Sequence, residues 1–444
     1  MGKPLGPTSG QGSRTATTPT TKTERATAKD AGANGARGDG KGSHADRDTL
    51  RVTLGPLKSR SKRNKKSKPK YKMAPADLLR QAEELFLAGR FDEALQTAAM
   101  ALAGIQPHGS APTLASLKPF SLIGMTYVQL GNTDLASDYF LKAVELDPDG
   151  SIPGSEGGGS EKFLWLAQLS EDGGHDSVRW FQRGATVLRN EIAAFGDGDV
   201  NTNDRRKKLA AVLCSITEVY MTDLSWEEDA ETQCESHITE ALLIAPDWHE
   251  PLQTFASVRI SQNRIDEARK ALMDSMELWK DLPPDDVGVP DYSQRISLAR
   301  LLMEVEAEED ALDVVRRLVQ EDDQSVEAWY LGGWCLYLIG EKRKRGAEDA
   351  VMHDEAQQQE KEEEFYQSSL TQSRRWLQHC LKLYRKVQYL DVKLREHTLE
   401  LVAELDKAIR DDSNDGAYET SEDDDDDDDN GGNGGDRDEE MGES

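Results

Sequence analysis

Apolar residues recur every three to four positions from residue 73 onward, which is the period of an α-helix with one buried side. Ala82 and Phe86 lie on one such face, Gly89 breaks the pattern, and Phe91 restarts it. This arrangement predicts a helix, a short turn and a second helix. Between residues 73 and 410 there is almost no alternation of period two, so the sequence does not support a β-sheet.

The same pair of helices recurs along the chain, most clearly in residues 117–148. Small residues stand where two helices of a pair would cross, aromatic residues stand where they would fill the space between helices, and a proline ends the second helix. These positions match the 34-residue tetratricopeptide signature: Phe120, Ile123, Gly124, Tyr127, Ala136, Phe140, Ala143 and Pro148.

Further units of this kind precede and follow that segment, with increasing divergence. We expect them at residues 78–101, 161–190, 207–246, 250–283, 292–324 and from 329 onward, the last being interrupted by a charged insertion at 341–367. An amphipathic helix at 388–410 is typical of a solenoid cap. The predicted fold is all-α: a right-handed superhelical solenoid of about seven tetratricopeptide-type helix pairs, with a C-terminal capping helix and disordered ends.

The two ends of the chain have few large apolar residues and cannot bury a core. Residues 1–72 are predicted to be a disordered basic segment, 73–410 the solenoid, and 411–444 a disordered acidic tail. Net charges are +13 for the first segment, −26 for the middle and −16 for the tail, which includes seven consecutive aspartates at 423–429. The block at 58–72, with nine basic residues, is either a nuclear-import signal or a basic arm.

The acidic middle segment points to a basic protein partner, because such a field repels nucleic acid and membrane surfaces. Solubility alone is the competing explanation of the charge. No catalytic motif, metal-ligand spacing or cofactor-binding motif occurs, so we expect a binding protein rather than an enzyme. No secretory leader or membrane span is expected. The cysteines are expected to be buried thiols of a reducing compartment: Cys214, Cys234, Cys335 and Cys380.

In repeats of this class, positions 2, 5, 9, 12 and 13 of the first helix line an inner groove. Carboxylates beside aromatic faces on that groove suit lysine and arginine side chains. A solvated side chain is the alternative for any single carboxylate, and packing against a neighbouring helix is the alternative for Trp334 and Tyr337. The candidate partner-binding residues are Glu83, Glu218, Glu250, Glu304, Glu327, Tyr330, Trp334 and Tyr337.

Three segments carry a resemblance to a known family: "LRQAEELFLAGRFDEAL", "IGMTYVQLGNTDLASDYFLKAVELDP" and "WYLGGWCLYLIGE". With the acidic groove and tail, they resemble the fungal dedicated assembly chaperones of the ribosomal large-subunit protein L-four. The resemblance implies a client with a long basic internal loop, which the chaperone protects and accompanies to nuclear pre-ribosome assembly.

The predicted function is therefore that of a chaperone in ribosome biogenesis, found in nucleus and cytoplasm and bound as a monomer to one client. No direct contact with nucleic acid or membrane is expected. The alternative is a generic nuclear acidic scaffold or histone-type chaperone that acts through the poly-aspartate tail, residues 423–429.

Overall fold

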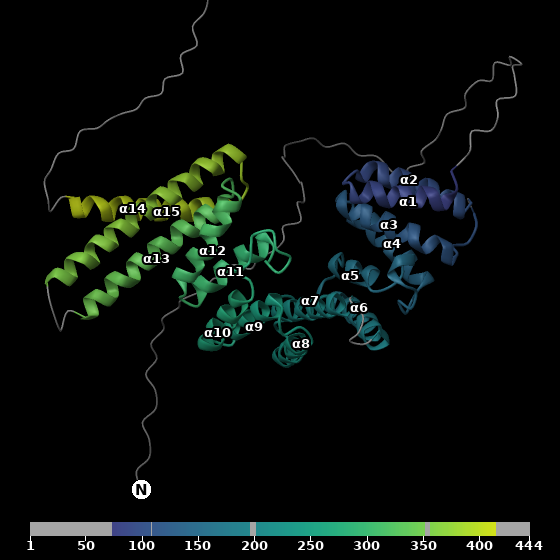
Figure 1. Ribbon diagram of the computed structural model, residues 1–444, viewed down its shortest axis with the longest axis horizontal. Helices are drawn as coiled ribbons and strands as arrows, with labels where there is room; N and C mark the ends of the chain where they lie inside the picture. Colours follow the sequence, from purple (N-terminus) through teal and green to yellow (C-terminus); the bar gives the residue numbers. More distant parts are fainter. Residues whose placement is uncertain (1–72, 108, 196–200, 351–355, 414–444) are drawn as a thin grey trace, which may run out of the picture. The chain divides into compact units, whose positions relative to one another are not determined.

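A computed structural model describes residues 73–107, 109–195, 201–350 and 356–413 (Figure 1). Fifteen α-helices and two short 3-10 turns lie in these ranges, and no strand is found there. In chain order they are α1 (Pro75–Leu87), α2 (Phe91–Ile105), η1 (Leu114–Ser116), α3 (Leu117–Gln129), α4 (Thr133–Leu146), η2 (Gly154–Glu156), α5 (Glu161–Gln168), α6 (Gly174–Phe195), α7 (Thr202–Met221), α8 (Ala230–Ile244), α9 (His249–Ser261), α10 (Ile265–Glu277), α11 (Tyr292–Glu304), α12 (Glu308–Glu321), α13 (Val326–Ala350), α14 (Ala356–Val387) and α15 (Val392–Ser413).

The helices pack in chain order, as expected of a solenoid. The main contacts join each helix to the next one, and the first helices of neighbouring pairs also touch, for example α7 with α9 and α11 with α13. The helices α1 to α14 form seven pairs, and α15 packs on the last pair. The predicted all-α solenoid of seven helix pairs with a cap is confirmed.

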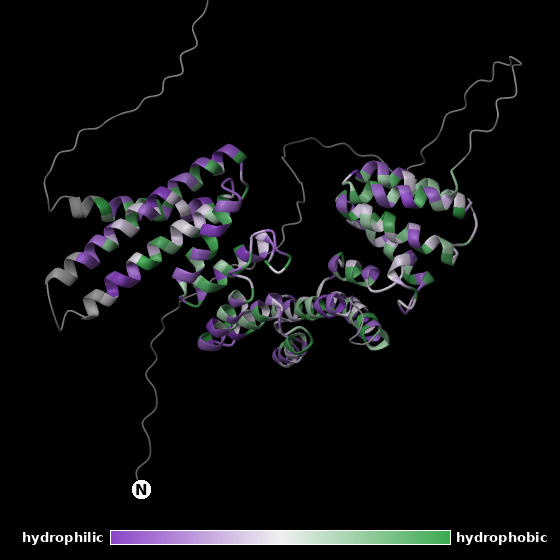
Figure 2. Cartoon of the chain, viewed as in Figure 1, coloured by the Kyte–Doolittle hydropathy of each residue, from purple (hydrophilic) through white to green (hydrophobic). Residues whose placement is uncertain are grey.

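Each pair is held by a close crossing of its two helices. A Cβ atom added at Gly124 in α3 would lie 2.8 Å from the ring of Phe140 in α4, which is fully buried. Apolar and polar residues occur together along the helices in Figure 2, as expected when one side of each helix is buried. The small residue at the crossing was predicted from the repeat signature, and the structure gives its physical reason.

The turns inside the pairs use left-handed backbone. Gly89 and Gly131 have φ of +71° and +73°, as the end of a helix commonly requires. In two later pairs Asn263 and Glu306 take the same conformation, each with φ of +58°. The turn geometry is therefore kept where the glycine of the signature is lost.

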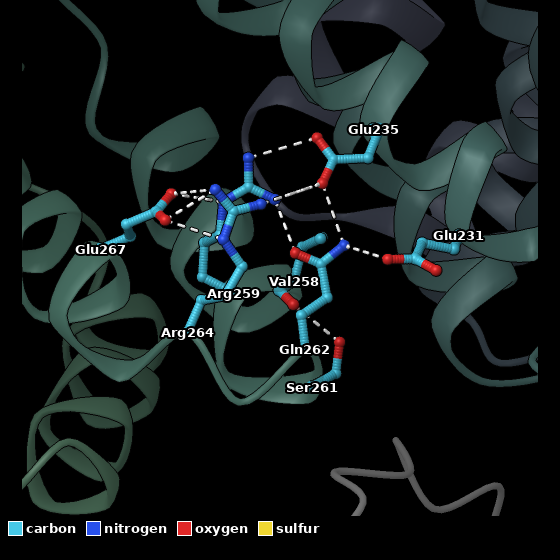
Figure 3. A network of polar contacts seen from close by, with 8 residues as sticks. All are labelled: Glu231, Glu235, Val258, Arg259, Ser261, Gln262, Arg264 and Glu267. Carbon is cyan, nitrogen blue, oxygen red and sulfur yellow. Dashed lines mark hydrogen bonds and ion pairs between the residues drawn. The ribbon is translucent and has the colours of Figure 1, made fainter.

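Repeats four and five are joined by a network of charged and amide side chains (Figure 3). Arg259 in α9 is 7% exposed, and its guanidinium pairs with Glu235 of α8 and Glu267 of α10. Gln262 donates a hydrogen bond to Glu235, 2.9 Å long. The bonds from Arg259 lower the pKa of Glu235, so both partners are charged and α8 is tied to the α9–α10 turn.

The charged insertion predicted at 341–367 falls on the end of α13 and the start of α14. The described residues of this stretch lengthen two helices, so that α13 has 25 residues and α14 has 32. The guanidinium of Arg343 lies 3.9 Å from the centre of the Phe365 ring, and the hydroxyl of Tyr366 donates to Glu341. Lysine, arginine, glutamate and glutamine are good helix formers, so the charge that looked like a break continues the helices. Residues 351–355 lie outside the described part.

The cap α15 runs to Ser413, three residues beyond the predicted end of the solenoid at 410. The predictions of disorder for residues 1–72 and for the remainder of the tail concern residues outside the described ranges. The four cysteines are buried and free, as predicted.

Two glycines of α13 give a matched test of the close crossing. A Cβ added at Gly333 would lie 2.6 Å from the buried Leu377 of α14, whereas one added at Gly346 meets nothing within 4 Å. We expect Gly333→Ala to destabilise the fold by about 1–3 kcal/mol through overpacking. Gly346→Ala should stabilise it by roughly 0.5–1 kcal/mol through helix propensity. Urea unfolding measures both, and a stable Gly333→Ala variant would contradict the assigned crossing.

Candidate functional site

The side of the first helices that carries repeat positions 2, 5, 9, 12 and 13 is here named the A-helix face; it belongs to α1, α3, α5, α7, α9, α11 and α13. Two ion pairs join a residue of this face on one first helix to a residue of it on the next, and Glu161 of α5 also pairs with Lys208 of α7, which lies outside the five positions. Glu83 pairs with Lys118 at 2.6 Å, and Arg300 pairs with Glu327 at 2.5 Å. Two of the five predicted carboxylates, Glu83 and Glu327, are therefore already neutralised by bases of the chain itself.

The predicted aromatic residues lie under the cap. Tyr330 is only 8% exposed, and its hydroxyl is hydrogen-bonded to Nδ1 of His397 in α15, 2.7 Å away. The ring of Trp334 lies 4.9 Å from the same imidazole, and the hydroxyl of Tyr337 donates to Glu404. The prediction that Tyr330 lines an open groove is wrong. Packing against a neighbouring helix is the arrangement found, because α15 covers the last first-helix of the solenoid.

A glycine-rich loop covers the A-helix face at α3. The hydroxyl of Ser121 donates to the carbonyl of Gly157 at 2.6 Å, and a Cβ at Gly157 would lie 2.4 Å from the backbone of Lys118. The loop is anchored by a buried ion pair of 2.7 Å between Lys162 and Asp147. The predicted face is thus partly covered by the chain itself at α3 and at α13.

The three other predicted carboxylates stand on successive first helices, Glu218 on α7, Glu250 on α9 and Glu304 on α11. Glu218 and Glu304 are exposed and Glu250 is half-buried. Within the described ranges none of the three forms an ion pair, and Glu250 receives one hydrogen bond of 3.4 Å from the indole of Trp248. The candidate site is accordingly this set of three carboxylates.

The environment of Glu218 and Glu250 disfavours the charged form of both carboxyl groups. Surrounding protein raises the pKa of Glu218 to about 7, and the charge of Glu250 adds to the effect. Burial also raises the pKa of Glu250, the bond from Trp248 lowers it, and Asp291 at the start of α11 raises it further. A nearby cation would stabilise the charged form of these two carboxylates. The sequence prediction missed Asp291, which caps the N-terminus of α11. It also did not use Lys118 and Arg300 as signals that Glu83 and Glu327 would be paired.

The arrangement fits cation recognition by a protein surface. The part of the chain that the structure describes holds no group of three side chains suited to a metal ion. None of the described helices has the length and apolar character needed to cross a membrane. The charged side chains of the A-helix face that form no ion pair among the described residues are acidic, so basic side chains are the groups that they can bind most favourably.

Replacing Glu218 by glutamine should have a pH-dependent effect on stability. The folded chain holds the proton of this carboxyl more tightly than the unfolded chain does, so the group lowers the free energy of unfolding as pH rises from 4.5 through about 7. We expect Glu218→Gln to raise the urea midpoint at pH 8 and to change it little at pH 4. The gain should stay below about 1 kcal/mol, because solvent reaches the side chain. Glu145→Gln on α4 controls for the loss of one charge, and equal effects at both pH values would contradict the assignment.

Comparison with known proteins shows which families this chain is similar to. Residues 118–149 match the tetratricopeptide repeat family. A probable assembly chaperone of rpl4 from Emericella nidulans is 51% identical over 362 residues, which are 80% of this chain and 89% of that protein. A probable assembly chaperone of rpl4 from Schizosaccharomyces pombe is 33% identical over 310 residues, which are 69% of this chain and 86% of that protein.

A solved structure of an assembly chaperone of RpL4 (Acl4) is 50% identical, with a TM-score of 0.57 over 62% of this chain and all of that one. The two curated relatives match most of this chain in sequence, and the solved structure also shares its fold over 62% of it. The chain belongs to the family of assembly chaperones of rpl4.

Proposed function

We propose that this chain is a dedicated chaperone of rpl4 that binds and protects the newly made protein through an extended basic segment and escorts it to nuclear pre-ribosome assembly. Two fungal relatives described as probable assembly chaperones of rpl4 support the client. The role is one of binding, with a single client on each chaperone.

The observation that supports the mode of binding is the row of carboxylates on α7, α9 and α11 that form no ion pair with any residue the structure describes. An extended segment that crosses these three helices can offer one basic side chain to each of Glu218, Glu250 and Glu304. Glu250 is half-buried, so a cation of the client that binds it loses part of its water shell. The charge pair is stronger in this less polar environment.

Release then follows from competition. Ribosomal RNA presents a denser array of negative charge than the chaperone does, so the basic segment transfers to RNA during assembly. The basic block at 58–72 supplies a nuclear-import signal in this proposal, and the chain works in both cytoplasm and nucleus.

Binding through the A-helix face should depend on salt. We expect the affinity for purified rpl4 to fall at least about tenfold between low salt and roughly 0.5 M salt, because ions screen the charge pairs. Replacing Glu218, Glu250 and Glu304 by glutamine should weaken binding and flatten this dependence. The control carries Asp134→Asn, Glu145→Gln and Asp274→Asn on the second helices α4 and α10. Calorimetry measures each affinity; an affinity that is the same at both salt concentrations would refute the charge mechanism.

Truncation of the chain after Ser413 separates the solenoid from the acidic tail. We expect this truncation to reduce the affinity for rpl4 by less than about threefold, since the tail contributes long-range attraction and the solenoid makes the specific contacts. The measurement compares both chains at one salt concentration. Loss of binding would instead support the alternative, a histone-type chaperone that acts through its poly-aspartate segment.

A further inference from the structure

Two ion pairs of the A-helix face share the same positions in their repeats. Glu83 is at position 9 of the first repeat and Lys118 is at position 2 of the second; Arg300 is at position 9 of the sixth repeat and Glu327 is at position 2 of the seventh. These pairs have lengths of 2.6 and 2.5 Å. Position 9 of one first helix therefore faces position 2 of the next, and opposite charges at the two positions form an ion pair across the joint between the repeats.

One other joint has charges at both positions, and there they have the same sign. Glu218 is at position 9 of the fourth repeat and Glu250 is at position 2 of the fifth, on the contacting helices α7 and α9. The thiol of Cys214, one turn before Glu218, is 1% exposed; burial raises its pKa, and the charges of Glu250 and Glu218 add to the effect. Two carboxylates thus face each other where the equivalent joints hold a carboxylate and a base.

The chain supplies no base to this joint within the described ranges. Lys207, in the same helix as Glu218, has its ammonium 4.1 Å from the centre of the Trp248 ring and forms no ion pair with either carboxylate. Repulsion between two carboxylates that surrounding protein partly desolvates is unfavourable. The two repeats stay packed at this joint because the ion pairs of Arg259, on a different face of α9, stabilise it. Arg259 is nine residues from Glu250, about two and a half helical turns.

We propose that the partner supplies the missing cation: one lysine or arginine side chain of the bound segment enters between Glu218 and Glu250 and completes the joint as Lys118 and Arg300 complete the others. The bound cation also draws α7 and α9 together, so that partner binding stiffens repeats four and five. An arginine fits this place best, because its planar guanidinium carries five N–H donors and can serve two carboxylates at once. The inference rests on the proposed function, since it names the two residues of the A-helix face, Glu218 and Glu250, that bind a cation of the basic segment.

Charge reversal at Glu250 tests the joint in the full chain. Glu250→Lys places a lysine at position 2 opposite Glu218 and repeats the pairing of Lys118 with Glu83. The variant should show a higher urea midpoint than the parent and at least tenfold weaker binding of purified rpl4. Glu218→Arg, which repeats the polarity of Arg300 and Glu327, should do the same. Glu145→Lys on α4 makes the same change of charge away from the A-helix face and should bind within threefold of the parent.

The double variant Glu218→Lys with Glu250→Lys restores like charges and should lose the gain in stability while binding stays weak. A Glu250→Lys variant with no higher midpoint than the parent would overturn the facing of the two positions. A higher midpoint with binding equal to that of Glu145→Lys would overturn the role of the partner's cation, although salt-dependent binding by the parent would still uphold the proposed function. Failure of the parent chain to bind rpl4 would refute the proposed function and leave the stability result standing.

Discussion

The close crossing of the two helices within each pair is the constraint on which the rest of the structure depends. At that point every repeat has a small residue at position 8, and all of them are buried: Ala82, Gly124, Ala167, Thr217, Ala256, Ala299 and Gly333. A single pair cannot cover its apolar side, so the next pair must pack on it. This stacking sets the first helices side by side and brings position 9 of one against position 2 of the next. The contact between charged positions of neighbouring first helices therefore depends on the helix spacing that these small residues permit.

The sequence predicted those features that depend on local periodicity. The fold, the number of pairs and the close crossing at Gly124 could be read from the repeat signature, because each repeat presents the same positions to its neighbours. The same register assigned Glu83 and Glu327 to one face, and each pairs with a base of a neighbouring first helix. It also contained the signal for their pairing, since Lys118 and Arg300 occupy the facing positions, but this signal has a meaning only when position 9 is known to meet position 2.

What the sequence could not predict depends on segments outside the repeat. The cap α15 has no repeat register, so nothing in the pattern places His397 against Tyr330 or Glu404 against Tyr337. Aromatic residues suit a buried contact and an exposed binding surface equally well, and only tertiary packing decides between them. The loop that lies on Ser121 presents the same difficulty, because its glycines allow a close approach to α3 without specifying it. These elements narrow the candidate site from the whole face to the helices α7, α9 and α11.

The placement of charge in repeats four and five links stability to the partner. Acidic residues around Arg259 are satisfied within the chain, whereas Glu218 and Glu250 face each other without a base among the described residues. Repulsion between the two carboxylates therefore lowers the free energy of unfolding of the free chain. A cation held between them reduces this repulsion. Because a partner that binds only the folded state stabilises it, the chaperone and its client stabilise each other by the same coupling. Carboxylates that lack a base in the folded repeat therefore favour binding of a basic partner. A base of the chain itself at this joint would pair with them and remove this contribution to binding.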